Sequence, residues 1–188
     1  MINLVPKFLS FYKKVNSSVV DEETRWSLWK EHYNFAAVPP GEKGMQMARN
    51  LLDNAWNKYR DNLLVIEEWT PEKEKVYDYL NKIKTLVIIY FVGAFENNAF
   101  VAPYDKNRLA LCLPIENGSS NIMLAHELTH IVHSNTADLS ADWERTIAST
   151  IIQEGLATQV SKFLVPGNPD EDYIEHKNGW FESCKQNR

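Results

Sequence analysis

A change of hydrophobic period in the middle of the chain limits the folds that are open to it. The segment 85–95 reads TLVIIYFVGAF, a continuous run dominated by β-branched and aromatic residues. A run of this kind predicts a buried β-strand. Two further strands are expected at 98–104 and 108–116, joined by a turn at 105–107. Together these segments predict a small, mostly antiparallel sheet.

Helical patterns come before the strands. The segment 22–33 reads EETRWSLWKEHY, and its large apolar residues recur at helical spacing, which predicts a helix whose aromatic face joins the core. His32 falls on a polar register beside that face, and we assign it no function. Further helices are expected at 45–64 and at 70–84, the second with Thr70 as its N-cap.

Helical patterns return after the strands. We expect one helix at 121–135, capped by Ser119 or Ser120. A second is expected at 140–165 and stops before Pro166. The fold class that follows is α+β and mainly helical, with helices before and after the sheet.

The length of the chain fits a single domain. A chain of 188 residues can bury a substantial core of its own. We therefore expect one domain over 1–188. It would comprise a helical N-terminal part at 1–85, the sheet with the two helices that follow it at 86–165, and a short C-terminal tail at 166–188.

Charge, hydropathy and cysteine content limit the kinds of partner and the cellular compartment that we expect for this chain. The net charge of −5 argues against a nucleic-acid or anionic-membrane partner, because such partners bind basic faces. No window approaches the roughly 18 apolar residues of a transmembrane helix, and the N-terminus lacks the pattern of a signal peptide. Cys112 and Cys184 are too few for a disulfide framework, and Cys112 is expected to be buried. These features predict a cytoplasmic protein. A secreted protein that has lost its signal peptide is the open alternative.

The segment 123–133, MLAHELTHIVH, carries the pattern His-Glu-x-x-His. Residues four apart on a helix lie one turn apart on one face, so His126 and His130 can both reach one metal ion at about 2.0–2.1 Å. Glu127 is rotated by one position, so it flanks the metal and can take a proton from a water there. His133 lies further along about the same face. It either supports the site or faces solvent, and we leave it out of the site.

A third ligand is needed, because catalytic zinc takes three protein ligands and keeps a fourth position open. Glu154 lies in the apolar stretch ASTIIQEGLATQV, where a buried carboxylate would need a cation to offset its desolvation. Gly155 costs roughly 1 kcal/mol relative to alanine in a helix centre, and close approach of two helices would explain it. A short polar loop would let the two helices lie antiparallel and bring Glu154 against His130. The alternative is that Glu154 is an ordinary surface residue.

The motifs HELTH and QEGLAT resemble those of the gluzincins, the group of zinc metallopeptidases that includes thermolysin. Over about Trp26 to Trp180, the order of elements is also similar to an uncharacterised bacterial domain family of predicted zinc-dependent proteases. The resemblance implies a zincin-like fold and a Zn²⁺ cofactor held by His126, His130 and Glu154. It also implies Glu127 as the catalytic base and a peptide or protein as the substrate.

The resemblance extends to the stretch NNAFVAPY. Several gluzincins carry an Asn-Ala-aromatic stretch on the sheet edge above the metal, where it pairs with an extended substrate. The match implies that Asn98 and Ala99, with Phe100 after them, bind the substrate main chain. A simple turn before a strand is the equally good alternative.

The C-terminal side of the site departs from the gluzincin pattern. Gluzincins carry a Tyr or His beyond the third ligand that stabilises the oxyanion, and a C-terminal lobe that walls the cleft. Here a short tail follows, with Tyr173 and His176 as candidates, so the chain is either a minimal form or a fragment. We predict a zinc-dependent peptidase. The alternative is a catalytically inactive zincin-fold scaffold or regulatory binding module, and the sequence does not indicate the oligomeric state.

Overall fold

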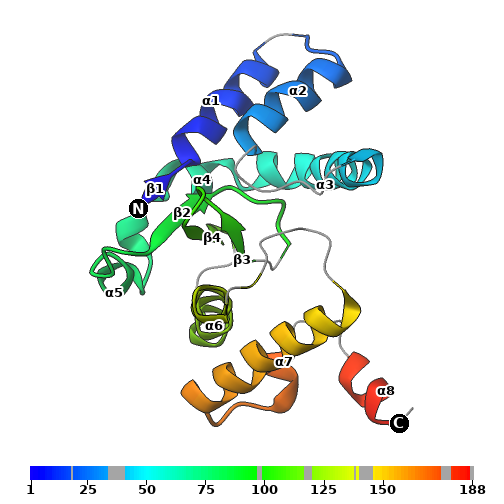
Figure 1. The fold of residues 1–188 in the computed structure, drawn as a ribbon. Helices are drawn as coiled ribbons and strands as arrows, with labels where there is room; N and C mark the ends of the chain where they lie inside the picture. The colour runs from blue at the N-terminus through cyan, green and yellow to red at the C-terminus, as the bar shows by residue number, and fades with distance from the viewer. Residues whose placement is uncertain are drawn as a thin grey trace. The chain divides into compact units, whose positions relative to one another are not determined.

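A computed structural model gives the fold of the chain (Figure 1). It describes residues 1–17, 19–33, 41–96, 99–116, 120–137, 139, 146–174 and 179–186. This part of the chain is mainly helical and divides into two compact units, unit 1 at Met1–Ser119 and unit 2 at Ser120–Arg188. The sequence grouped the sheet with the helices that follow it, whereas the sheet belongs to the same compact unit as the helices before it.

Unit 1 contains the sheet and the helices that precede it in the chain. Its elements are β1 (Ile2–Asn3), α1 (Val5–Asn16), α2 (Glu22–Tyr33), α3 (Gly41–Asp61), α4 (Leu63–Glu68), η1 (Pro71–Lys73), α5 (Tyr77–Leu80), β2 (Val87–Phe91), β3 (Phe100–Pro103) and β4 (Leu109–Pro114). The bounds of α2 are those that the sequence predicts.

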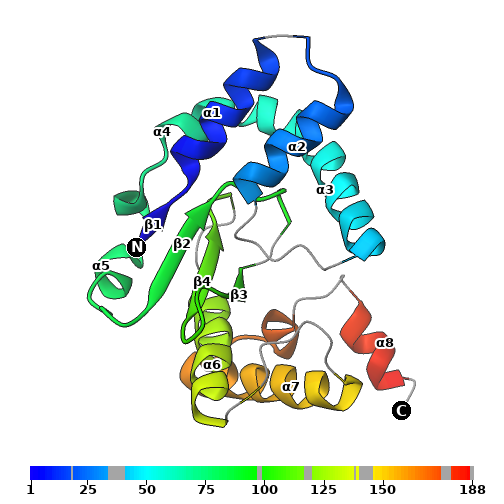
Figure 2. The same ribbon diagram turned by 45° about the horizontal axis from the view of Figure 1, so that its top comes forward.

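The core of unit 1 is aromatic. Helices α1 and α2 lie side by side (Figure 2), and Trp26 and Trp29 of α2 are buried as expected. His32 is buried too, with its ring centroid 5.3 Å from that of Phe8 and 6.3 Å from that of Phe11. The expected polar register for His32 is therefore wrong. Its position, three residues after Trp29, lies on the same side of the helix as the aromatic face.

The two helices predicted between α2 and the sheet differ from the expectation. The segment 45–64 is divided between two helices: residues 45–61 belong to α3, which begins earlier than predicted, and a break at Asn62 separates α3 from α4. The helix at 70–84 is wrong, because only η1 and the single turn of α5 form there, and the Thr70 side chain caps neither. This charged segment has too few apolar residues to bury a helix face, and packing of such a face is the main source of helix stability.

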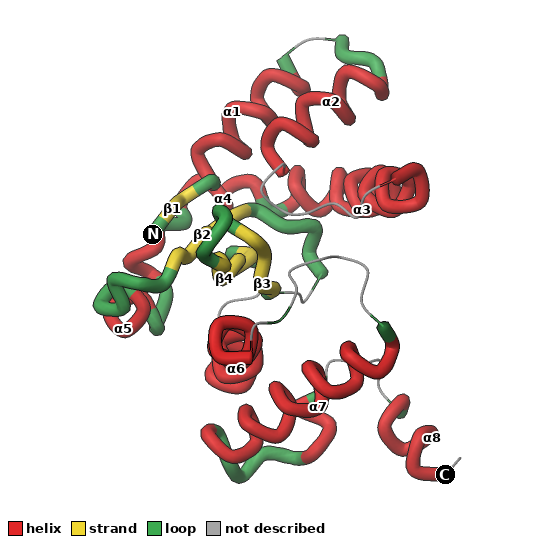
Figure 3. Tube along the Cα trace, in the orientation of Figure 1, coloured by secondary structure: helices red, strands yellow, loops and turns green. Residues whose placement is uncertain are grey.

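The sheet is mixed, so the mostly antiparallel arrangement is wrong. The strands lie in the order β1-β2-β4-β3 (Figure 3). Strand β2 is parallel to both β1 and β4, and β3 is antiparallel to β4. Every residue of β2 is buried, and a strand covered on both faces is typical of parallel pairing. The predicted turn before β4 is confirmed, with the Asn107 N–H donating to Asp105 Oδ1 at 3.0 Å. Cys112 of β4 is fully buried, as expected.

Unit 2 contains the two helices that carry the predicted metal ligands. Its elements are α6 (Asn121–Ala137), α7 (Ile147–Leu164), η2 (Asp170–Tyr173) and α8 (Trp180–Gln186). Helix α7 begins later than predicted, and residues 140–145 lie outside the described part of the chain. It crosses α6 steeply in both views, so the antiparallel pair expected from the sequence is wrong (Figures 1 and 2). None of the described helices combines the length and the hydropathy needed to cross a bilayer.

Candidate metal centre

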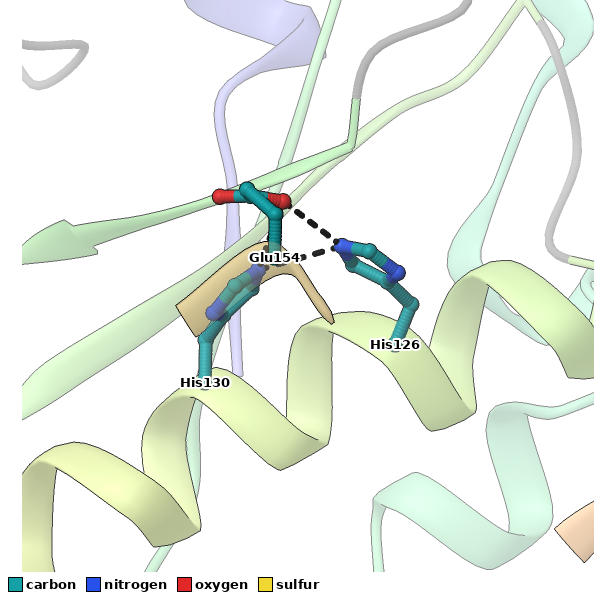
Figure 4. A group of neighbouring side chains, drawn as sticks. All are labelled: His126, His130 and Glu154. Atoms are coloured by element: carbon teal, nitrogen blue, oxygen red, sulfur yellow. Dashed lines mark hydrogen bonds and ion pairs between the residues drawn. The ribbon is translucent and has the colours of Figure 1, made fainter. Parts of the chain in front are cut away.

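Helix α6 presents two histidines on one face. The helix begins after Ser120, whose hydroxyl accepts a hydrogen bond from the Met123 N–H at 3.1 Å, so Ser120 is its N-cap. His126 and His130 lie one turn apart and their rings point to the same side (Figure 4). Their side chains are 21% and 16% exposed, so both rings are only partly covered by the protein.

Helix α7 supplies the carboxylate. Thr146 is its N-cap and accepts a hydrogen bond from the Ser149 N–H at 3.1 Å. Ala157 and Ser161 are fully buried, and small side chains on a buried face allow two helix backbones to approach closely. That close packing is what brings Glu154 of α7 to the histidines of α6 (Figure 4).

Two sequence arguments for Glu154 prove wrong in their details. Its side chain is 50% exposed, so burial among apolar residues is not what demands a cation. A Cβ built on Gly155 would meet no other heavy atom within 4 Å, so Gly155 is not the point of close helix approach. Glu154 is nevertheless correctly placed as a partner of the histidines, because it follows the buried Gln153 on the side of α7 that meets α6.

The three ligand atoms form a triangle of the size that a zinc ion needs. Nε2 of His126 lies 3.1 Å from Nε2 of His130. Oε2 of Glu154 lies 3.2 Å from the first nitrogen and 3.5 Å from the second. A tetrahedral ion with bonds of about 2.0–2.2 Å places its ligand atoms roughly 3.3–3.6 Å apart. The arrangement therefore fits a single zinc ion with little adjustment.

The electrostatics of the triangle also favour a cation. Hydrogen bonds from His126 and His130 hold the pKa of Glu154 well below its usual range, so this residue is a carboxylate at neutral pH. When both imidazoles are neutral and present Nε2 lone pairs to the centre, two nitrogens and a carboxylate oxygen converge on one point. Three converging acceptors repel one another unless a proton or a metal ion lies between them.

The donor set narrows the choice of metal. Two imidazole nitrogens and one carboxylate oxygen suit Zn²⁺, and the same set also serves non-haem iron(II). Among the described residues, these three make a group whose ligand atoms lie within 4.8 Å of one another. With three protein ligands, a tetrahedral ion keeps one position for water or substrate, which is the pattern of catalytic rather than structural zinc sites.

Glu127 and His133 flank this group on α6. Glu127 follows His126 directly, is turned about 100° around the helix axis from it, and is partly buried. His133 is also partly buried and is not one of the three converging ligands, in agreement with its omission from the predicted site.

The remaining predicted site residues are not among the three residues that converge at the candidate metal centre. Asn98 and His176 lie outside the described residues. Ala99 belongs to unit 1, is buried, and directly precedes β3, which is an edge strand of the sheet. Tyr173 is buried, and its hydroxyl donates to the Val165 carbonyl at the C-terminal end of α7, so it ties down the turn after that helix.

No protein-family model, curated protein or solved structure matches this chain.

The sequence did not single out the residues that position the carboxylate. Gln153, Ala157 and Ser161 form the buried stripe of α7, at intervals of one turn. Their regular spacing of small or polar residues was visible in the sequence, but the apolar residues between them dominated the pattern.

Proposed function

We propose that the chain is a zinc-dependent peptidase with a zincin-like metal centre, in which His126, His130 and Glu154 hold the ion. The observation that carries the proposal is the triangle of two imidazole nitrogens and one carboxylate oxygen with edges of 3.1, 3.2 and 3.5 Å. Zinc, when bound, lowers the pKa of a coordinated water to about 7 and polarises a substrate carbonyl.

In this proposal Glu127 is the general base. It follows His126 in the sequence and is one helix position away from the ligand face, so it would act on a water held by the ion rather than bind the ion itself. Glu127 accepts the proton of the attacking water and later transfers it to the leaving amine. Glu154 would bind the ion as a carboxylate, the form that hydrogen bonds from His126 and His130 already favour by lowering its pKa.

The substitution Glu127→Gln tests the chemistry separately from the metal. It preserves side-chain size and removes the base, so hydrolysis of an unfolded protein such as casein should fall at least about a hundredfold while zinc content is retained. The measurement is casein turnover with zinc determined on the same samples. Glu171→Gln, at an exposed position in η2, is the matched control and should turn over like the wild type. Unchanged turnover in Glu127→Gln would refute the role of Glu127.

A second candidate is an inactive zincin-fold scaffold or regulatory module. It is favoured by the hydroxyl of Tyr173, which is hydrogen-bonded at the end of α7 and so does not serve as an oxyanion donor in this conformation. Stoichiometric zinc with no turnover of casein by the wild-type chain would select this candidate over the peptidase.

A further inference from the structure

Helix α7 buries its polar side and exposes its apolar side. The positions that pack inward are Gln153, Ala157 and Ser161. Large apolar side chains point outward instead, with exposed fractions of 81% for Ile147, 66% for Ile151, 64% for Ile152 and 83% for Phe163. Contact with α6 therefore removes little apolar surface of α7 from water.

Apolar burial is sparse throughout the described part of unit 2. Its buried apolar residues are Leu124 and Ile131 of α6, Ala157 of α7, and Tyr173 of η2. Burial of apolar area is the main favourable term in helix packing, at about 25 cal/mol per Å². Small folding units with so little of it are usually held by a further link such as a disulfide or a metal.

A metal at the candidate centre would supply that link between α6 and α7. His126 and His130 belong to α6, whereas Glu154 belongs to α7, so one ion would join the two helices. We infer that metal binding holds α7 on α6, and that the metal-free pair opens much more readily. The inference rests on the metal binding that the proposed function requires, but it does not depend on peptidase activity.

The metal-free pair of α6 and α7 opens readily because the contacts that remain between the two helices are weak. Without the ion, the three residues are joined only by side-chain contacts of 3.1–3.5 Å, with which water competes because the Glu154 side chain is 50% exposed. Polar groups of the buried stripe of α7 form hydrogen bonds within that helix, which separation from α6 does not break. The Gln153 amide donates to Ser149 Oγ at 2.8 Å, and the Ser161 hydroxyl donates to the Thr158 carbonyl at 2.9 Å. Opening the pair therefore costs little when the ion is absent.

Hydrogen–deuterium exchange of the full-length chain tests the inference. Protein stripped with a chelator is compared with protein at a free zinc concentration about 100-fold above its dissociation constant. If zinc binds only the closed pair, amide exchange in α7 should slow by about 100-fold. Exchange in the buried centre of α3, which belongs to unit 1 and contains no predicted ligand, should not change and provides the internal control.

The variant Glu154→Gln checks that the link runs through the carboxylate. Its α7 amides should exchange as fast with zinc as without it, while α3 exchange in the same sample verifies that the chain is folded. Glu171→Gln should behave like the wild type. Zinc binding by the wild type with unchanged α7 exchange would overturn the inference and leave the proposed function standing. Zinc-dependent slowing without peptidase activity would support the inference and contradict the proposed function, and absence of zinc binding would overturn both.

Discussion

Gly155 lies in the middle of α7 without a steric reason to be glycine. A Cβ at this position would meet no heavy atom within 4 Å, and its φ does not fall in the left-handed region. Glycine costs about 1 kcal/mol relative to alanine in a helix interior. We therefore predict that Gly155→Ala raises the free energy of unfolding by about 0.5–1 kcal/mol, measured from denaturant midpoints.

The matched control for this prediction is a small residue that does pack. Ser161 is fully buried against neighbouring structure, so Ser161→Leu should destabilise the chain by overpacking, by about 1–3 kcal/mol. Destabilisation by Gly155→Ala would instead mean that Gly155 serves a close contact after all.

His32 makes the stability of unit 1 depend on pH. Burial lowers its pKa from 6.5 to about 4, with the Lys7 charge acting in the same direction and the backbone of Val92 acting against it. Above pH 6.5 the imidazole is neutral in both the folded and unfolded chains. As the pH falls toward 4 only the unfolded chain takes up the proton, so stability is lost, by about 3 kcal/mol over the whole window.

The variant His32→Gln isolates the contribution of His32 to the pH dependence of stability. It should remove the loss of unfolding free energy between pH 6.5 and 4, whatever its effect at neutral pH. Burial raises the pKa of Glu116, so this residue changes the stability in the opposite direction as the pH falls. Both proteins contain Glu116, so its contribution cancels when their pH profiles are compared. Denaturant titrations of both proteins across the window make the measurement, and parallel pH profiles would contradict the assignment to His32.

At the residue scale, helix spacing predicted that His126 and His130 lie together on one face, but it predicted neither the position of Glu154 nor the surroundings of the group. His126 and His130 were predictable because helix geometry fixes the relation of residues four apart. Glu154 was predictable only as a candidate, since its distance from the histidines depends on how α7 crosses α6. The burial of His32 was missed because a polar side chain on an aromatic face is assigned by its type rather than by its place on the helix.

At the scale of elements, the N-cap of α7 offers a direct test of local structure. Thr146 Oγ1 accepts the Ser149 N–H, one of the helix donors that have no partner within the helix. We predict that Thr146→Ala lowers the free energy of unfolding by about 1 kcal/mol. Thr150→Ala, an exposed change in the first turn of the same helix, should cost less because it removes no cap. Equal losses of unfolding free energy in the two variants would show that the Thr146 cap does not contribute to the stability of α7.

The sheet illustrates what the sequence could and could not predict about elements. The hairpin of β3 and β4 was predictable, because a short polar turn joins two apolar runs. The parallel pairing of β2 with β4 was missed, although the unbroken apolar run of β2 favoured a strand covered on both faces. The two-residue strand β1 carries no sequence pattern of its own, because pairing with β2 alone defines it.

At the scale of the whole molecule, the proposed ligands and the predicted substrate strand belong to different compact units. All three proposed ligands lie in unit 2, whereas Ala99 lies in unit 1. Metal binding can therefore be tested without any assumption about substrate. The mainly helical α+β class was predictable from the change of hydrophobic period. The division after the sheet was not, because the short polar stretch NGSS at 117–120 is equally typical of an ordinary loop between a strand and a helix.

The metal content of the purified chain tests the central claim most directly. Elemental analysis of protein prepared without chelator should give close to one zinc per wild-type chain. His130→Ala should lose that zinc because it removes one of the three ligands. His133→Ala, one turn further along α6 and outside the triangle, should keep it. Full zinc retention in His130→Ala, or a wild-type chain without any bound metal, would contradict the account.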